Sequence, residues 1–541
     1  MLRRALPWLA VAGFFVGLAL VGRLERQDGP QAPLNVLVLT VESFRADALA
    51  AAPGLLRLAM QNGIRYDAHR AVSAWTGSNV LTLLTGLSPL QHNIHSRGQL
   101  IDERQELSLE VLADQGWRVA GLQAFMRIPL FNQLGLGREG VVGEIGQQPH
   151  DWLRARAATG EAFVLWYHYL HSHLPYRPSS DFDVDWRALL PPGREADARF
   201  AALRERGRLE TGTVVFEADE LPAIRALYEA GIAEFDAWFA GLWAVLEETN
   251  LARNTVVVVT ADHGEELLER GEVGHASTTL AGHLHEEVVR LPLILFLPPG
   301  VSGPPPGSVI DRPSDHRDIM PTLLLLLGQP VPAILGGADL LRLPRTRAWN
   351  GVTSGAGYSE PEPDHPAAMI YARREGRWKL QLSEPGEGAA LYDLDADPGE
   401  RANVAAAYPD VVTSMLDGLA AERAQALPLA EETAATGAGP RPRWLRPAAS
   451  GVFGYDRIGG RFSLEWQGLA EADYVLAYRY RDGDGWLEGE IPVSGTVHDF
   501  GAIDRRYWQT WVVPNGPYRV RVGYAGETPR WSEWLELIAV E

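Results

Sequence analysis

Two runs of aliphatic residues, each ending in side chains that can bind a metal, constrain the fold of this chain most. The first run, Asn35–Val41, is followed by Glu42, and the second, Val256–Thr260, is followed one residue later by Asp262 and His263. Continuous apolar runs of this length are typical of strands buried on both faces of a parallel sheet. Because ligands gather outside the carboxyl ends of such strands, we expect these side chains to meet at one edge of the sheet.

Further strand-like runs alternate with helical patterns along the chain, at Val119–Leu122, Ala162–Tyr169 and Leu293–Leu297. This alternation predicts an α/β domain, residues 34–316, with a mainly parallel sheet flanked by helices. Within it, the Arg/Glu/Ala-rich stretch 194–212 is expected to be a solvated helical insertion.

A smaller C-terminal subdomain is predicted for residues 317–425, with a strand pair around Met369–Leu382 and a turn-rich segment at Leu391–Val404. An Ala/Pro/Thr-rich linker, 426–449, follows it. Short alternating runs between Gly/Asp/Pro turns in 450–541 predict a small β-sandwich of fibronectin type III-like shape. Its many aromatic residues belong either to a core with cross-strand pairs or to a face that binds a glycan or a protein.

The N-terminal segment, residues 1–33, holds an uncharged run of 18 residues from Ala5 to Gly22, preceded by Arg3 and Arg4. That length just reaches a membrane span, and the arginines favour a cytoplasmic N-terminus. We therefore expect a membrane anchor with the catalytic part outside the cytoplasm, on the periplasmic or extracellular side. A cleaved signal peptide is the alternative, and it would make the protein secreted.

Composition excludes several kinds of site. The 541 residues carry a formal charge of −20, which argues against nonspecific binding to nucleic acid. The chain contains no cysteine, so disulfides, zinc–thiolate sites and a cysteine nucleophile are excluded.

A third stretch, AWTGSNVLTLLTG, carries the hydroxyl of Thr76 just ahead of a helical pattern. Glu42, Asp262 and His263 offer hard oxygens and an imidazole, a set suited to Mn, Zn, Mg or Ca ions. If Thr76 joins them, a bound metal ion lowers the pKa of its hydroxyl and makes it a nucleophile. Each part also has a purely structural interpretation when it is considered alone. Asp262 and His263 would then form a cap or a surface turn, and Glu42 would be a neighbour of a helix N-cap.

Six segments in order resemble the sulfatase family of the alkaline phosphatase superfamily. They are NVLVLTVESFRADAL, AWTGSNVLTLLTG, HYLHSHLPYRP, TADHGE, HEEVVRLPLILF and LYDLDADPGE, and they span about residues 35–420. The resemblance implies an alkaline phosphatase/sulfatase-like α/β fold. It also implies a metal-dependent hydrolase or transferase of sulfate or phosphate esters that works through a covalent enzyme–ester intermediate.

The resemblance assigns roles to individual residues. It makes Glu42, Thr76, Asp262 and His263 metal ligands, Thr76 the nucleophile, His173 a contact of the ester or leaving group, and either His275 or His283 a substrate-binding residue. Ser43 stands where the family usually has a second aspartate. The remaining histidines of these segments, His92, His95, His168 and His171, are interpreted as solvated or core imidazoles.

The departures from the family pattern concern the nucleophile. Sulfatases carry a Cys or Ser, with Pro and Arg after it, that is oxidised to formylglycine; here TGSNV follows Trp75 and has neither Pro nor Arg. Threonine cannot form that aldehyde, but it can attack phosphorus. Together with Glu42 it resembles the phosphoethanolamine and phosphoglycerol transferases, so a phosphate mono- or diester, of an envelope lipid or glycan, is the expected substrate. Sulfate-ester hydrolysis without formylglycine and an inactive binding or scaffold protein are the alternatives.

Overall fold

The computed structural model describes the following parts of the chain: residues 33–95, 108–122, 148–193, 200, 203, 216–275, 282–355, 369–384 and 388–426, strand segments 443–446, 451–454, 461–467, 473–482, 485–494, 497–502 and 518–524, and residues 532 and 534–540. The predicted anchor, most of the predicted insertion and most of the predicted linker lie outside these residues. Within them, none of the helices combines the length and the apolar character that a membrane span needs.

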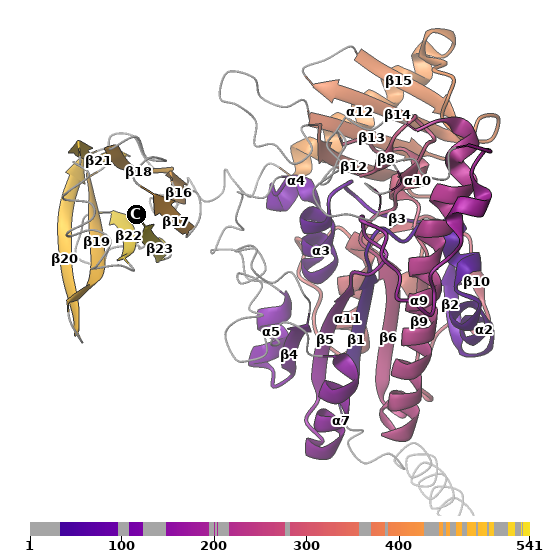
Figure 1. Ribbon diagram of the computed structural model, residues 1–541, viewed down its shortest axis with the longest axis horizontal. Coiled ribbons are helices and arrows are strands. Elements are labelled where there is room, and N and C mark those ends of the chain that lie inside the picture. Colours follow the sequence, from indigo (N-terminus) through magenta and orange to yellow (C-terminus); the bar gives the residue numbers. More distant parts are fainter. Residues whose placement is uncertain are drawn as a thin grey trace, which may run out of the picture.

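A seven-stranded sheet with the order β10-β2-β9-β6-β1-β5-β4 forms the centre of the larger unit (Figure 1). Its strands are β1 (Asn35–Val41), β2 (Gly63–Tyr66), β4 (Arg118–Leu122), β5 (Phe163–Tyr169), β6 (Thr255–Ala261), β9 (Leu293–Phe296) and β10 (Val309–Ile310). Strand β1 runs parallel to β5 and β6, and β4 runs parallel to β5, whereas β9 is antiparallel to β2 and β6. The predicted mainly parallel sheet is confirmed.

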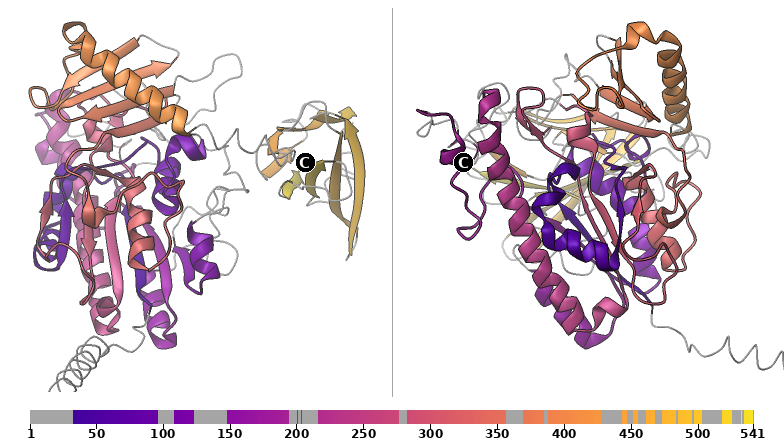
Figure 2. Two further views of the ribbon diagram at one scale, coloured as in Figure 1. Left: turned by 180° about the vertical axis from the view of Figure 1, so that it is seen from behind. Right: turned by 90° about the vertical axis from the view of Figure 1, so that its right-hand side faces the viewer.

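Helices cover both faces of this sheet (Figures 1 and 2). One hydrophobic cluster joins Leu37, Leu39 and Val41 of β1 to α2 (Pro53–Asn62), α7 (Pro149–Thr159) and α9 (Leu221–Glu248). A second cluster joins Val36 and Val38 to α3 (Thr76–Thr85), α5 (Ser108–Asp114) and α11 (Ile319–Leu326). Because successive strand residues point to opposite faces, an unbroken apolar run is what a strand between two helical layers requires.

Shorter elements complete this unit. They are η1 (Ala46–Ala51), β3 (His69–Arg70), α4 (Pro89–His92), η3 (Trp186–Leu189), η4 (Ala218–Glu220), η5 (Leu251–Arg253), β7 (Glu266–Leu267), β8 (Val273–Gly274), α10 (Glu286–Val289), β11 (Ser314–Asp315), η6 (His316–Asp318) and η7 (Leu340–Arg342). Strand β3 pairs with β11, and β7 pairs with β8. The β7–β8 hairpin begins three residues after His263, and His275 follows β8 directly.

A four-stranded antiparallel sheet lies beyond the large one. It consists of β12 (Trp349–Ser354), β13 (Met369–Glu375), β14 (Trp378–Glu384) and β15 (Gly388–Asp393), and η8 (Ala405–Ala407) and α12 (Pro409–Ala426) follow. The predicted strand pair corresponds to β13 and β14. The predicted subdomain 317–425 begins with helix α11, which packs into the core of the large sheet. The second sheet itself begins at Trp349.

Two further sheets lie near the C-terminus. The strands β16 (Arg443–Arg446), β18 (Arg461–Gln467) and β21 (Val497–Ala502) form one, and β17 (Gly451–Gly454), β19 (Asp473–Asp482), β20 (Gly485–Ser494), β22 (Tyr518–Tyr524) and β23 (Leu535–Val540) form the other. One hydrophobic cluster takes Trp466 from the first sheet and Tyr474 from the second, and both are fully buried. These two aromatic residues therefore serve the core, and the fibronectin type III likeness stays a prediction.

A buried lysine joins the small sheet to the large unit. Lys379 of β14 lies with its Nζ 3.1 Å from Glu286 Oε1 and 3.0 Å from Glu400 Oε1. Its side chain and that of Glu400 have no exposed surface, and Glu286 also pairs with Arg70. Removing one partner of such a cluster leaves an uncompensated buried charge.

We expect Lys379→Met to lower the free energy of unfolding by about 3 kcal/mol, because the buried Glu400 and the partly exposed Glu286 lose their shared cation. Chemical denaturation at pH 7 measures the change. Arg377→Met is the matched control on the same hairpin: Arg377 is half exposed and 3.5 Å from Asp393, so its loss should cost less than about 1 kcal/mol. Equal losses in the two variants would contradict the assigned role of Lys379.

The stabilisation by Lys379 should also depend on pH. Burial alone would raise the pKa of Glu400, but Lys379 and His285 lower it from 4.5 to about 2. A carboxylate whose pKa falls on folding stabilises the protein above the unfolded pKa, and this contribution is lost as the pH falls through the folded pKa. The difference in unfolding free energy between wild type and Lys379→Met should therefore be constant above about pH 5 and shrink as the pH falls towards 2.

Candidate active site

Glu42 lies where β1 ends and is completely buried. Its backbone N–H donates to the Tyr169 carbonyl at the end of β5, 2.9 Å away, which continues the strand pairing by one residue. One carboxylate oxygen, Oε1, lies 3.4 Å from Thr76 Oγ1, and the other, Oε2, lies 2.7 Å from His168 Nε2. The side chain therefore has one oxygen towards the predicted nucleophile and one towards the neighbouring strand.

Asp262 and His263 follow the end of β6, the strand on the other side of β1. Asp262 Oδ1 accepts hydrogen bonds from the backbone N–H groups of Ser43 at 3.0 Å and His263 at 2.9 Å. This contact ties the chain after β6 to the chain after β1, where Ser43 has a left-handed φ of 55°. Gly264 comes so close to the Glu287 carbonyl that a Cβ would lie 2.2 Å from it, so only glycine fits there.

Thr76 is the first residue of α3, and its side chain is partly exposed. The loop before this helix is held by Asn79, whose Oδ1 accepts from the N–H groups of Val72 and Ser73 and whose Nδ2 donates to the Ser73 carbonyl. The unpaired N–H groups and the dipole at a helix N-terminus favour negative charge. Thr76 Oγ1 therefore lies at a position where negative charge is favoured.

Four acceptor atoms converge at this point, and their arrangement fits a metal ion. His263 donates from Nδ1 to the Gly264 carbonyl at 2.8 Å, so in its neutral form the lone pair is on Nε2. That Nε2 lies 3.1 Å from Thr76 Oγ1, 3.2 Å from Asp262 Oδ2 and 3.4 Å from Glu42 Oε1. Asp262 Oδ2 is buried and accepts no hydrogen bond within the described part of the chain. Two buried carboxylate oxygens and an imidazole nitrogen around a hydroxyl form a ligand set that suits a divalent cation.

Burial and mutual contact shift the pKa values of these residues. Burial raises the pKa of Glu42 well above its ordinary value, and the neighbouring Asp262 raises it further. Burial would also raise the pKa of Asp262, but His263, His168 and two backbone N–H groups hold it below its usual range. The pKa of His263 is raised because its two carboxylate neighbours outweigh its burial.

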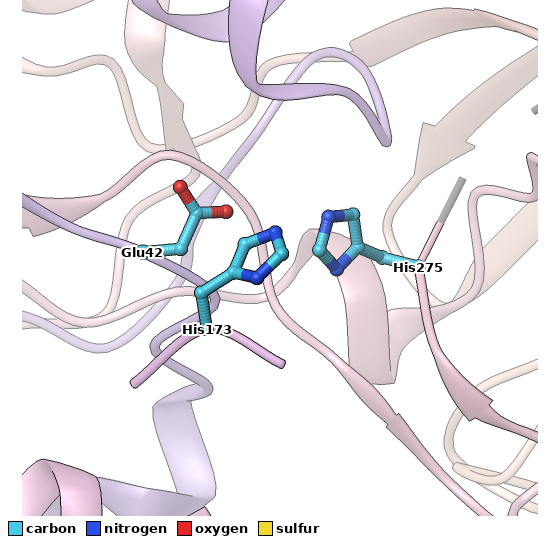
Figure 3. Close-up of side chains that lie close together, drawn as sticks. All are labelled: Glu42, His173 and His275. Carbon is cyan, nitrogen blue, oxygen red and sulfur yellow. The ribbon is translucent and has the colours of Figure 1, made fainter. Parts of the chain in front are cut away.

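His173 and His275 approach the same centre from other segments. Figure 3 shows their side chains gathered with that of Glu42, and one potential ligand atom from each lies within 4.8 Å of the other two. The ring of His275 lies 5.1 Å from that of His173 and 4.1 Å from that of His263, between centroids. Burial lowers the pKa of both, that of His173 to about 4, so both rings are neutral at pH 7. They could contact a bound ester or add ligands for a metal.

The structure separates the two histidines that the sequence left as alternatives. His275 belongs to the cluster just described, whereas His283 lies with its Nε2 3.1 Å from Glu266 Oε2 and its ring beside that of His285. Ser43, at the position of the family's second aspartate, places its Oγ 3.5 Å from both Glu42 Oε1 and His275 Nδ1. His171 is exposed, in agreement with its interpretation as a solvated side chain.

Two residues of the site were missed from the sequence. His168 is buried, as a core imidazole would be, but it bonds directly to Glu42. Glu265 is fully buried, and its Oε1 lies 3.1 Å from His275 Nδ1; burial raises its pKa to about 7. The available signals were the single imidazole within the mostly apolar run of β5 and the second carboxylate of TADHGE.

Sequence comparison identifies relatives of the middle of the chain. The sulfatase family model matches residues 144–329, which include His173, Asp262, His263 and His275 but not Glu42 or Thr76. Arylsulfatase K of Canis lupus familiaris is 30% identical over 207 residues, which are 37% of this chain and 37% of that protein. The match thus spans little more than a third of the curated relative.

Structural comparison covers more of the chain. The phosphonate monoester hydrolase SpPMH from Silicibacter pomeroyi is similar with a TM-score of 0.58 and 20% identity, over 73% of this chain and 96% of that one. BT4656, solved in complex with its substrate D-glucosamine-2-N,6-O-disulfate, is similar with a TM-score of 0.53 and 17% identity, over 73% and 98%. These likenesses show a sulfatase-like α/β fold. The middle of the chain is thus similar to the sulfatase family, and the part of the chain covered by these structures has a sulfatase-like α/β fold.

Proposed function

We propose that this protein is a metal-dependent hydrolase or transferase of phosphate esters that uses Thr76 as its nucleophile. The observation that carries the proposal is the convergence of Thr76 Oγ1 with His263 Nε2 and the buried oxygens of Glu42 and Asp262. Glu42, Thr76, Asp262 and His263 would hold the divalent ion. When bound, the ion lowers the pKa of the Thr76 hydroxyl and neutralises charge on the ester.

The reaction consists of two displacements at phosphorus. In the first, Thr76 loses its proton to solvent, its Oγ1 forms a bond to phosphorus, and the bond to the leaving-group oxygen breaks. That oxygen receives a proton from His173 or His275 after either ring has been protonated by solvent. In the second, water or an acceptor alcohol attacks the phospho-threonine, the P–Oγ1 bond breaks, and Thr76 regains a proton.

The identity of the nucleophile favours phosphate over sulfate. The chain has no cysteine, and a threonine with its Cβ methyl group cannot become formylglycine. Sulfate esters remain the second candidate, because the curated relative is an arylsulfatase and one structural neighbour binds a sugar disulfate. The phosphonate monoester hydrolase among the structural neighbours is compatible with attack at phosphorus on this fold.

A substrate panel tests this proposal. Wild-type protein is incubated with an aryl phosphate, an aryl phosphodiester, an aryl phosphonate monoester and an aryl sulfate, each with Mn, Zn, Mg or Ca ions and with a chelator. We expect metal-dependent release from a phosphorus ester that exceeds release from the sulfate by at least about tenfold. Faster release from the sulfate would transfer the proposal to sulfate-ester hydrolysis, and inertness towards every ester would favour a binding or scaffold role.

The proposed location rests on the sequence alone. If residues 5–22 anchor the chain, the site lies outside the cytoplasm, where envelope lipids and glycans are the accessible phosphate esters. Fractionation of cells that express the full chain, followed by protease treatment of intact cells or spheroplasts, tests this location.

A further inference from the structure

A row of hydrogen-bonded side chains lies on one face of the sheet beneath Glu42. The parallel pairing of β1 and β5 places Thr40 in register with His168. Because side chains two residues apart on a strand share a face, Thr40 and Glu42 of one chain segment lie on the same face as Trp166 and His168 of the other. All four side chains are buried, each with at most 2% of its surface exposed.

The direction of each hydrogen bond follows from what the atoms can donate. Trp166 Nε1–H can only donate, and it does so to Thr40 Oγ1 at 2.9 Å. Thr40 Oγ1 lies 2.7 Å from His168 Nδ1 and 3.5 Å from the Tyr167 carbonyl, so its one proton goes to the nearer histidine. His168 then carries its proton on Nε2, which lies 2.7 Å from Glu42 Oε2. A doubly protonated ring would donate from Nε2 as well, so this last bond does not depend on the charge of His168.

We propose that His168 is a positioning residue for Glu42, and that Thr40, held by Trp166, sets the orientation and tautomer of His168. The bond to Oε2 leaves Oε1 directed at Thr76 and His263. The inference rests on the proposed role of Glu42 as a metal ligand. Outer partners that hold a metal-binding side chain in place commonly contribute 10- to 100-fold to metal affinity.

Because the Glu42 carboxylate is buried, water cannot replace the donor that it receives from His168. Within the described residues, His168 is the side chain that donates to Glu42 Oε2, and no solvent reaches that oxygen. Without it the carboxylate would lose a donor in a buried site, and rotation towards another partner would carry Oε1 away from Thr76. The Ser172 hydroxyl and the Tyr169 carbonyl hold only the backbone of Glu42 and cannot orient its carboxylate.

Two pairs of variants test the inference. His168→Leu removes the donor and His168→Gln retains an N–H group; Thr40→Val removes the hydroxyl at constant shape and Thr40→Ser retains it. Binding of Mn²⁺ is measured by calorimetry on the full chain. We expect affinity to fall about 10- to 100-fold in His168→Leu and about tenfold in Thr40→Val, with recovery towards wild type in His168→Gln and Thr40→Ser.

A spectroscopic readout separates positioning from a general loss of structure. Nitrogen-15 NMR of ring-labelled, metal-free protein should show His168 with a protonated Nε2 and an unprotonated Nδ1. Thr40→Val should weaken that preference for the Nε2 proton. Its unfolding temperature should stay within a few degrees of that of the wild-type protein. A His168 ring with its proton on Nδ1 in wild type would overturn the inference.

Glu42→Ala in the same Mn²⁺ titration distinguishes the metal-binding role of Glu42 from the positioning role of His168 and Thr40. Loss of Mn²⁺ binding in Glu42→Ala, with unchanged binding in His168→Leu and Thr40→Val, would overturn the positioning role alone. Unchanged binding in Glu42→Ala would overturn the metal-binding role of Glu42 and the inference with it. Weak binding in all three, with recovery in the two conservative variants, supports both.

Discussion

Thr76→Val should lower the turnover of a phosphate ester by at least about 10⁴-fold, because it removes the attacking oxygen and keeps the shape of the side chain. Thr76 Oγ1 is the hydroxyl that faces both Glu42 Oε1 and His263 Nε2. Valine retains the branched Cβ at the first position of α3, so the helix should still form. Initial rates at saturating metal and substrate measure the effect.

Thr76→Ser is the matched control, since it keeps a hydroxyl at the same place. It should retain measurable turnover and form the corresponding phospho-serine. Mass spectrometry of wild type quenched during turnover should find the added phosphate on Thr76, and none on Thr76→Val. Turnover of Thr76→Val within tenfold of wild type, or phosphate on another residue, would contradict the assignment.

Asp262→Asn should weaken the binding of the divalent ion by more than the 10- to 100-fold that the loss of an outer partner costs. The substitution removes the negative charge from a buried carboxylate whose Oδ2 has no hydrogen-bond donor among the described residues. The amide oxygen can still accept from the N–H groups of Ser43 and His263, so the local chain path should persist. Turnover should fall on the order of 10³-fold, because the ion contributes several kcal/mol to stabilising the transition state.

Metal-dependent stabilisation gives an independent measurement. A ligand at 100 times its dissociation constant raises the free energy of unfolding by about 2.7 kcal/mol when it binds only the folded state. Added metal should raise the unfolding midpoint of wild type and leave that of Asp262→Asn almost unchanged. His171→Asn, at an exposed position on the segment that carries His173, should respond like wild type. Equal stabilisation of Asp262→Asn and wild type would place the metal elsewhere.

Much of the fold follows from local patterns in the chain. Strands β1, β5, β6 and β9 lie within one residue of their predicted bounds, because runs such as NVLVLTV are mostly aliphatic on both faces and suit a strand covered on both sides. Glu42 and Asp262 follow such strands directly, so their meeting at one edge of the sheet is a consequence of parallel pairing.

The paths of the loops could not be predicted in the same way. His275 and His283 both follow the TADHGE segment at plausible distances, and their spacing does not distinguish them. The β7–β8 hairpin brings His275 back beside His263 and Ser43, while His283 lies against Glu266. That return depends on contacts such as the close approach of Gly264 to Glu287, which join segments distant in the chain.

The sequence alone therefore determines the buried strands and the carboxylate and imidazole side chains at their ends, and it predicts a threonine nucleophile in place of a formylglycine precursor. Packing establishes which imidazole faces which carboxylate. Thr40 and His168 are 128 residues apart, and only the register of β1 against β5 makes them neighbours. A shift of one residue would turn His168 to the other face and leave Glu42 without its donor. Because both faces of β1 and β5 are mostly apolar, the pattern of either strand alone does not specify that register.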